Sequence, residues 1–310
     1  MHKHVFYLLA IVILFTACTK KSETIRLEWS AIDSINQNLP EGINVYHATN
    51  AGENIRAWYV KVEESRPEIE SRIIVSNDDD ARETVSEFAL RLHAPVVING
   101  GYFRMDLYPA THVGILKVDD QLIHAATTSV LRGEQRFFLH RAALGIDSAG
   151  GLGVEWVSSE GDKVYKWEKP IPNKPGKPGG QLDSTFRELW TARDILGAGP
   201  LLIRDGKIKI PINEEVFFGT SIPDVHPRTA AGITKDGSLI LLLVDGRQLA
   251  SRGVNLSELA EILYDLHCVD ALNLDGGGSS ALVINGLLMN RPAGSSIERE
   301  VMSAIAVYAK

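Results

Sequence analysis

The feature that most constrains the fold is a series of tight turns between apolar runs. Asp-Gly or Asn-Gly pairs interrupt "IRDGKIKI" (203–210), "ITKDGSLILLLV" (233–244) and "LVINGLLMN" (282–290). Such pairs favour two-residue hairpin turns, and "KVDDQLIH" (117–124) and "IDSAGGLGVEW" (146–156) carry similar signals. The pattern predicts an α+β fold with a mixed, largely antiparallel β-sheet core and a few packed helices, rather than alternating strand and helix units.

Other segments add strands and two helices to this core. Asp80 and Glu83 have capping-box spacing ahead of an amphipathic run, and Asn255 and Glu258 have the same spacing ahead of a helix expected over 256–267. Further strands are expected at Ile43–His47, Ile55–Val62 and Ser71–Val75.

The N-terminus reads as a targeting segment followed by one folded domain. A short basic region, an apolar stretch too short to span a bilayer and small residues precede Cys18, as in a bacterial lipoprotein signal. We expect a signal peptide at 1–18 with a lipidated Cys18, a tether at 19–30 and the domain at 31–310, with a mobile Pro/Gly-rich loop at 169–180. This predicts a protein that is lipid-anchored to a membrane of the bacterial cell envelope. An ordinary secretory signal is the alternative.

Charge and cysteine content exclude several classes of protein. The formal net charge is −7 and no long basic run occurs, which argues against nucleic-acid binding. Only Cys18 and Cys268 are present, so no disulfide framework or cysteine metal site is available. Cys268 lies in an apolar stretch that we expect to be helical, with a buried, inert thiol. No cofactor and no metal are expected.

The segment "NLDGGGSSALVING" (273–286) contains three consecutive glycines between two apparent strands. It lacks the spacing of a dinucleotide fingerprint and the Gly-Lys-Ser/Thr of a P-loop. It resembles a nucleophile elbow only in part, because a strand and not a helix follows, so a serine hydrolase is a weak alternative.

The glycine turn is a candidate anion site. Its backbone N–H groups can form an anion-binding nest, and the alternation of residues places Asn273 and Asp275 on one face of the preceding strand. The alternative is a simple turn that Asp275 caps.

Three strands in fact end in a polar residue followed by glycine, at "NGG" (99–101), "DG" (245–246) and "DGG" (275–277). Turn chemistry explains any one of them. If the three ends converge, they form a polar cleft with a glycine floor. Arg228-Thr229, two residues after His226, supplies a fork of donors suited to phosphate or carboxylate, although a structural ion pair is also common.

Six motifs in order resemble those of the phosphodiester glycosidase family, and the resemblance covers roughly residues 30–310. It implies removal of a sugar from a sugar-1-phosphodiester by cleavage at the anomeric carbon, with release of a phosphomonoester. The motifs are "VINGGYF" (97–103), "GAGPLLIRDGK" (197–207), "HPRTAAGIT" (226–234), "LLLVDGR" (241–247), "GVNLSELAEIL" (253–263) and "ALNLDGGGSSALVING" (271–286).

The resemblance also suggests roles for these residues. Asp275 or Asp245 is expected to act as nucleophile or base, His226 is a candidate proton shuttle, and Glu258 belongs to a family motif although its position suits a helix cap. Arg228, Thr229 and the glycine amides are expected to hold the phosphate, and Asn99 and Asn273 to orient sugar hydroxyls. The expected substrate-binding residues are Asn99, Gly100, Gly101, Arg228, Thr229, Asn273, Gly276, Gly277, Gly278 and Ser279.

Two other functions stay open. A lipoprotein that binds glycan without cleaving it is the main alternative, but two carboxylates beside an anionic ligand would repel it. A phosphodiesterase that cuts the P–O bond usually needs a metal cluster, and the nine histidines are scattered along the chain. We expect the partner to be a carbohydrate phosphodiester of a bacterial envelope or a dietary glycan.

Overall fold

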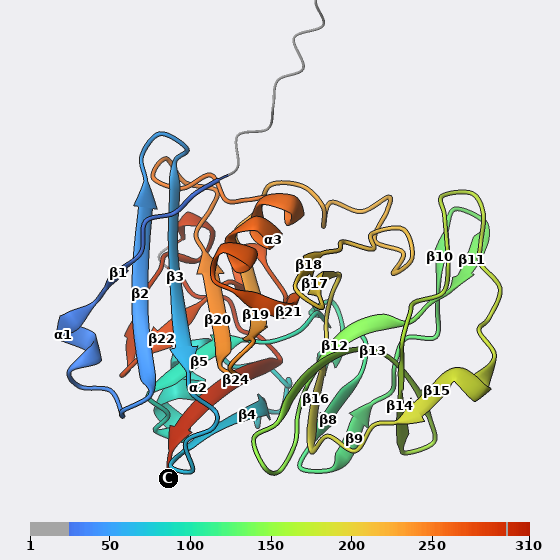
Figure 1. Cartoon of the computed structure of the whole chain (residues 1–310), viewed down its shortest axis with the longest axis horizontal. Coiled ribbons are helices and arrows are strands. Elements are labelled where there is room, and N and C mark those ends of the chain that lie inside the picture. The colour runs from blue at the N-terminus through green and yellow to red at the C-terminus, as the bar shows by residue number, and fades with distance from the viewer. Residues whose placement is uncertain (1–24, 296) are drawn as a thin grey trace, which may run out of the picture.

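The structure, a computed structural model, describes residues 25–295 and 297–310 and is built from three antiparallel sheets (Figure 1). The largest sheet has eight strands. In spatial order they are β1 (Ser30–Ala31), β2 (Ile43–Asn50), β3 (Ile55–Val62), β20 (Leu239–Val244), β19 (Arg228–Thr234), β21 (Cys268–Asn273), β17 (Leu201–Arg204) and β18 (Lys207–Ile208).

A five-stranded sheet packs against the first, and a seven-stranded sheet forms the right-hand side of Figure 1. The five strands are β23 (Leu287–Leu288), β22 (Leu282–Ile284), β5 (Val96–Asn99), β24 (Ser303–Ala309) and β4 (Ile69–Val75). The seven are β15 (Arg187–Leu189), β14 (Lys163–Trp167), β13 (Leu152–Glu160), β12 (Arg141–Ile146), β16 (Asp194–Gly197), β8 (Leu116–Val118) and β9 (Gln121–His124). Separate hairpins are formed by β6 (Phe103–Arg104) with β7 (Thr111–His112), and by β10 (Ser129–Arg132) with β11 (Gln135–Phe138).

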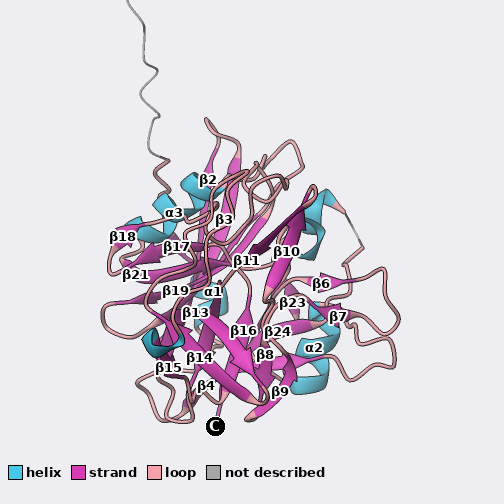
Figure 2. Ribbon diagram, turned by 90° about the vertical axis from the view of Figure 1, so that its right-hand side faces the viewer, coloured by secondary structure: helices cyan, strands magenta, loops and turns pink. Residues whose placement is uncertain are grey.

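Side-chain alternation explains why the central strands are apolar throughout. On β20, Leu241 and Leu243 face the core between the sheets, whereas Leu242 and Val244 face the opposite core under helix α3 (Leu256–Asp265). Helix α2 (Val85–Leu92) covers the outer face of the five-stranded sheet in the same way. Figure 2 shows the two helices on opposite sides of the stacked sheets. The remaining helices are α1 (Asp33–Asn36) and the 3₁₀ turns η1 (Ser184–Phe186), η2 (Gly277–Ser279) and η3 (Pro292–Gly294).

The predicted fold class and hairpins are confirmed. Every strand pair in the described residues is antiparallel, and Asp205-Gly206 and Asn285-Gly286 join β17 to β18 and β22 to β23 with positive φ at both residues. The capping box of α3, Asn255 with Glu258, is also confirmed.

The predicted cap of the first helix is wrong by four residues. Thr84 and Glu87 form the capping box of α2. Asp80 instead bonds Arg82, and Glu83 bonds Arg91. Both pairs have the same spacing, and the helix begins at the one that directly precedes the buried Val85.

Three further expectations need correction. Residues 25–30 are not a free tether, because Ile25 is buried and Trp29 packs edge-on against Tyr59. Residues 169–180 are irregular but anchored, since the buried Asn173 donates to Phe138 O and Glu214 O. Cys268 begins strand β21 and not a helix, and burial raises the pKa of its free thiol to about 12.

The predicted signal peptide and Cys18 lie outside the described residues. Within the residues that are described, no helix has the length and apolar character needed to cross a membrane.

Candidate active site

The predicted strand ends at Asn99 and Asp275 meet, and the side chain of Asn99 at the end of β5 joins them. Its Nδ2 donates to the Asp275 carbonyl (2.7 Å), and its Oδ1 accepts from Thr229 Oγ1 (2.7 Å) and from the Ala281 amide (3.2 Å). Asn99 and Thr229 are both buried, and their side chains bond to each other. Their predicted substrate contacts stay predictions, while the geometry shows that they position the strand ends.

The glycines after Asn99 provide close packing. A Cβ on Gly100 would lie 2.5 Å from Ser303 Oγ, and one on Gly101 would lie 2.4 Å from Gly197 O. The Gly100 carbonyl accepts the Asp275 amide (3.1 Å). Glycine is therefore required here so that β5 can approach β24 and β16, and the predicted substrate contacts of Gly100 and Gly101 stay predictions.

The turn after Asp275 is only partly free to bind an anion. The Gly276 amide donates to Asp275 Oδ1 (3.0 Å), and the Gly277 amide donates to Pro227 O (2.9 Å). Two of the three glycine amides in the predicted nest are thus already used within the protein, since the chain turns into the short 3₁₀ turn η2 with a positive φ at Gly277. The expectation that all three hold the phosphate is not supported by this geometry.

What the glycines accommodate instead is a pair of arginines. A Cβ on Gly277 would lie 3.3 Å from Arg247 Nη2, and a Cβ on Gly278 would lie 2.6 Å from Arg299 Cζ. The absence of side chains on the turn lets both guanidinium groups approach its backbone. Neither Arg247 nor Arg299 was expected to contribute to the site from the sequence.

His226 holds Arg247 in place. Its Nδ1 lies 3.1 Å from Arg247 Nη2, and its Nε2 lies 2.8 Å from Ser221 O. Because the arginine can only donate, the ring is assigned as the Nε2–H tautomer, with Nδ1 as acceptor. This contact makes His226 a positioning residue for Arg247, and its role as a proton shuttle stays a prediction.

Arg228 is buried and bonded to backbone. Its Nε donates to Val254 O (2.9 Å), and its Nη2 donates to Ile222 O (2.8 Å) and Asp224 O. Burial lowers the pKa of Arg228 to about 10. Since its donors hold the 222–224 loop, its predicted direct contact with phosphate stays a prediction, and its buried charge adds to the positive potential of the site.

Asp275 is the carboxylate best placed for chemistry. Its side chain is only partly buried, and desolvation raises its pKa to about 6, opposed by the Ser279 hydroxyl, the Gly276 amide and the charge of Arg299. A carboxyl group with a pKa near 6 can exchange protons close to neutral pH.

Asp245 has a more enclosed setting. It is 1% exposed, its Oδ1 accepts from Asn290 Nδ2 (3.2 Å), and its Oδ2 has no partner in the described residues. Burial raises the pKa of Asp245 as well. Asn290 also donates to Ser280 O (2.9 Å), so Asp245 supports the strand that follows the glycine turn.

Glu258 is engaged in the helix cap. Its two carboxylate oxygens accept from Arg252 at 3.0 and 2.9 Å, and Oε2 also accepts from the Asn255 amide (2.8 Å). This arrangement fits the helix-cap role that the position of Glu258 suggests, and a catalytic role, which its place in a family motif implies, stays a prediction without geometric support.

Asn273 and Tyr102 complete the floor of the site. Asn273 Nδ2 lies within hydrogen-bond distance of Tyr102 Oη (2.7 Å), Leu274 O (2.8 Å) and Gly199 O (3.1 Å), and Tyr102 Oη donates to Gly199 O (2.8 Å). Burial and the charge of Asp275 raise the pKa of Tyr102. Asn273 Oδ1 is buried without a partner in the described residues, so this side chain keeps one free acceptor.

The profile of the phosphodiester glycosidase family matches residues 92–308. The chain belongs to this family. The match spans β5, the glycine turn and the arginines around it, and it bears out the resemblance of the six motifs.

Named relatives and solved structures agree with this assignment. The chain is 31% identical over 214 residues to the bovine and human N-acetylglucosamine-1-phosphodiester alpha-N-acetylglucosaminidases, which covers 68% of this chain but 35% and 36% of those proteins. It therefore spans about a third of the length of these relatives.

The auto-inhibited catalytic domain of the zebrafish protein superposes with a TM-score of 0.61 at 23% identity, over 93% of this chain and 89% of that one. A hypothetical protein from Synechocystis also gives 0.61, at 20% identity, over 88% and 63%. Both structural matches show the fold.

Proposed function

We propose that this protein hydrolyses a sugar-1-phosphodiester at the anomeric carbon and releases the sugar and a phosphomonoester. The observation that carries the proposal is the placement of the Asp275 carboxylate, with its pKa near 6, at a turn flanked by Arg247 and Arg299. In the described residues, neither guanidinium lies within 4.0 Å of a carboxylate, so both charges are free for an anionic group.

The chemistry follows from this charge distribution. A phosphomonoester is a good leaving group, so the main requirements are to hold its negative charge and to stabilise an oxocarbenium-like transition state. The arginines meet the first requirement, and the Asp275 carboxylate meets the second. Asp275 either attacks the anomeric carbon or removes a proton from the attacking water, and in both cases the bond between that carbon and the phosphate oxygen breaks.

The bond that breaks can be identified with labelled water. Purified protein incubated with an N-acetylglucosamine-α-1-phosphodiester in ¹⁸O-water should place the label on the released sugar, as measured by mass spectrometry. Label on the phosphate would instead indicate a phosphodiesterase. Binding of the substrate without turnover would favour the glycan-binding alternative.

The two arginines provide a second test. We expect Arg247→Ala and Arg299→Ala each to lower kcat/KM by about 10- to 100-fold, the usual effect of removing a hydrogen bond to a charged group. Arg136→Ala is the control, since Arg136 is an exposed arginine of the β10–β11 hairpin. Unchanged kinetics in both site variants would contradict the assignment of the phosphate position.

We also propose that Cys18 is lipidated and anchors the protein to a membrane of the bacterial envelope. The basic, apolar and small-residue order before Cys18 supports this. Labelled fatty acid should be incorporated by the natural chain and not by Cys18→Ser. Equal labelling of both would contradict the proposal.

A further inference from the structure

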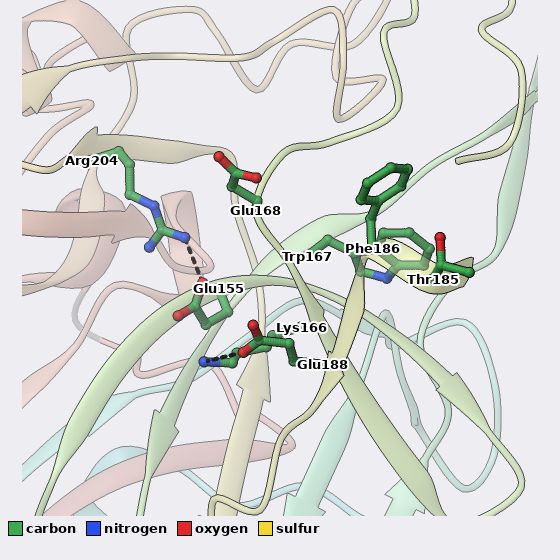
Figure 3. A pocket seen from close by; sticks show the side chains of 8 residues that line it. All are labelled: Glu155, Lys166, Trp167, Glu168, Thr185, Phe186, Glu188 and Arg204. Carbon is green, nitrogen blue, oxygen red and sulfur yellow. Dashed lines mark hydrogen bonds and ion pairs between the residues drawn. The ribbon is translucent and has the colours of Figure 1, made fainter. Parts of the chain in front are cut away.

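A second cleft lies on the seven-stranded sheet, away from the glycine turn. It has a volume of about 470 Å³ and is open to solvent at one side. In Figure 3 its aromatic side chains gather at one end and two ion pairs lie at the other. Its lining residues come from β13, β14 and the residue after it, η1, β15 and β17, and they are Glu155, Lys166, Trp167, Glu168, Thr185, Phe186, Glu188 and Arg204.

Phe186 is an exposed aromatic residue on a fixed turn. Its side chain is 71% exposed, although it ends the 3₁₀ turn η1 that the Asp183 carboxylate caps at the Thr185 amide (2.9 Å). The next residue, Arg187, stacks over the Tyr165 ring at 3.8 Å and pairs with Glu160. The cap and the Arg187 contacts fix the backbone that carries the ring, so this backbone loses little conformational freedom when a ligand covers the ring.

The polar side chains of the cleft are mostly paired. Arg204 bonds Glu155, and Lys166 Nζ lies 3.2 Å from Glu188 Oε2. Glu168 has no ion-pair partner among the described residues, which leaves three carboxylates against two cations. The cleft therefore disfavours an anion but offers planar acceptors and donors to a ligand rich in hydroxyl groups.

These features together match a pyranose ring. A sugar has an apolar face of C–H groups that packs on an aromatic ring and a rim of hydroxyls that bonds carboxylate and guanidinium groups. The cleft volume suits a small ligand of one or two such rings.

The cleft is connected to the candidate active site through Trp156. Arg204 lies over the Trp156 ring (5.3 Å), and Trp156 Nε1 donates to Glu215 (2.8 Å). Glu215 also accepts the Leu201 amide (3.0 Å), two residues after Gly199, which bonds Tyr102 and Asn273. The buried Trp156, Glu215 and the start of β17 thus link the cleft to the floor of the candidate active site.

We propose that this cleft is a second binding site that takes an uncharged pyranose unit of the glycan to which the scissile phosphodiester belongs. The identity of the ligand as part of that glycan rests on the proposed function, whereas binding of a saccharide in the cleft does not. The site holds a neighbouring sugar and so favours long substrates over short ones.

Saccharide binding is measured directly by ligand-observed NMR on the full chain, with N-acetylglucosamine and its β-linked dimer as probes. We expect Phe186→Ala to weaken binding of the dimer about fivefold, as expected for loss of one aromatic contact. Leu90→Ala is the matched control, because Leu90 is 74% exposed on helix α2. Equal binding of the dimer by the natural chain and by Phe186→Ala would overturn the proposal. Binding of glucosamine, which is a cation, without binding of neutral sugars would overturn it as well.

Kinetics separate this proposal from the proposed function. Phe186→Ala should leave hydrolysis of a minimal sugar phosphodiester unchanged and raise KM about fivefold for a substrate that carries further sugars. If the protein binds saccharide through Phe186 but hydrolyses no sugar phosphodiester, the second binding site is supported and the proposed glycosidase function is refuted. If the protein is active but Phe186→Ala does not change its binding of saccharide, the glycosidase function is supported and the second binding site is refuted.

Discussion

We expect Asp275→Asn to lower kcat/KM by about a thousandfold, within the range for loss of a positioned acid or base. Asparagine keeps the size of the side chain and can still accept the Gly276 amide, so the turn should be preserved. The measurement is hydrolysis of an N-acetylglucosamine-1-phosphodiester beside the circular dichroism spectrum. Asp162→Asn, an exposed aspartate in the β13–β14 turn, is the control.

The pH dependence gives an independent check on Asp275. Because burial raises its pKa to about 6, the ionised form needed for attack or proton removal is lost as the pH falls through 6. We therefore expect kcat/KM of the natural chain to fall below that pH. A raised pKa in the folded state also means that ionised Asp275 destabilises the protein at neutral pH. Asp275→Asn should then have a Tm at pH 7 equal to or above that of the natural chain, and substantial activity in this variant would exclude the assigned role.

The largest effect on stability is expected at Glu215. Its fully buried carboxyl group accepts from Trp156 Nε1 (2.8 Å) and from the amides of Leu201 (3.0 Å) and Ala142 (3.1 Å), which belong to two different sheets. Glu215→Ala leaves three buried donors without a partner, and we expect the free energy of unfolding at pH 5 to fall by about 4 kcal/mol. Urea denaturation measures this, with Glu214→Ala as the neighbouring control.

The loss should depend on pH in a defined direction. Burial raises the pKa of Glu215 to about 7, so its contribution to stability is fully present below its unfolded pKa of 4.5 and is lost as the pH rises through 7. Glu215→Ala should therefore cost more free energy at pH 5 than at pH 8. A larger cost at pH 8, or an equal cost for Glu214→Ala, would contradict this account.

Local signals in the sequence predicted most of the sheet structure. The Asp-Gly and Asn-Gly turns predicted the hairpins. The motif of a polar residue followed by glycine, which Asn99 and Asp275 share, predicted that these two residues lie close together. The turn chemistry is encoded within a few residues, which is why it can be read without the fold. The signal failed at Asp80 and Glu83, where two candidate caps compete within one helix start.

The charged residues around the site could not be predicted from local sequence signals. Arg299 reaches Gly278 from a different part of the chain, and Glu215 lies in an irregular segment with no pattern around it. Their roles arise from packing between segments distant in sequence. The sequence places Arg247 two residues after Asp245, but it does not show that the Arg247 guanidinium approaches Gly277. The structure shows that this approach is possible because Gly277 has no side chain.

The bonds of Asn99 bear on the time at which the site forms. Its side-chain amide bonds to residues that lie 130, 176 and 182 positions further along the chain. Contacts of such sequence separation form slowly, because a long loop must close before any of them can stabilise the fold. During synthesis, Thr229 is the first of these partners to leave the ribosome, and the full set of Asn99 bonds cannot form until the glycine turn and Ala281 have followed it. The candidate active site is therefore assembled late, once nearly all of the sheets are in place.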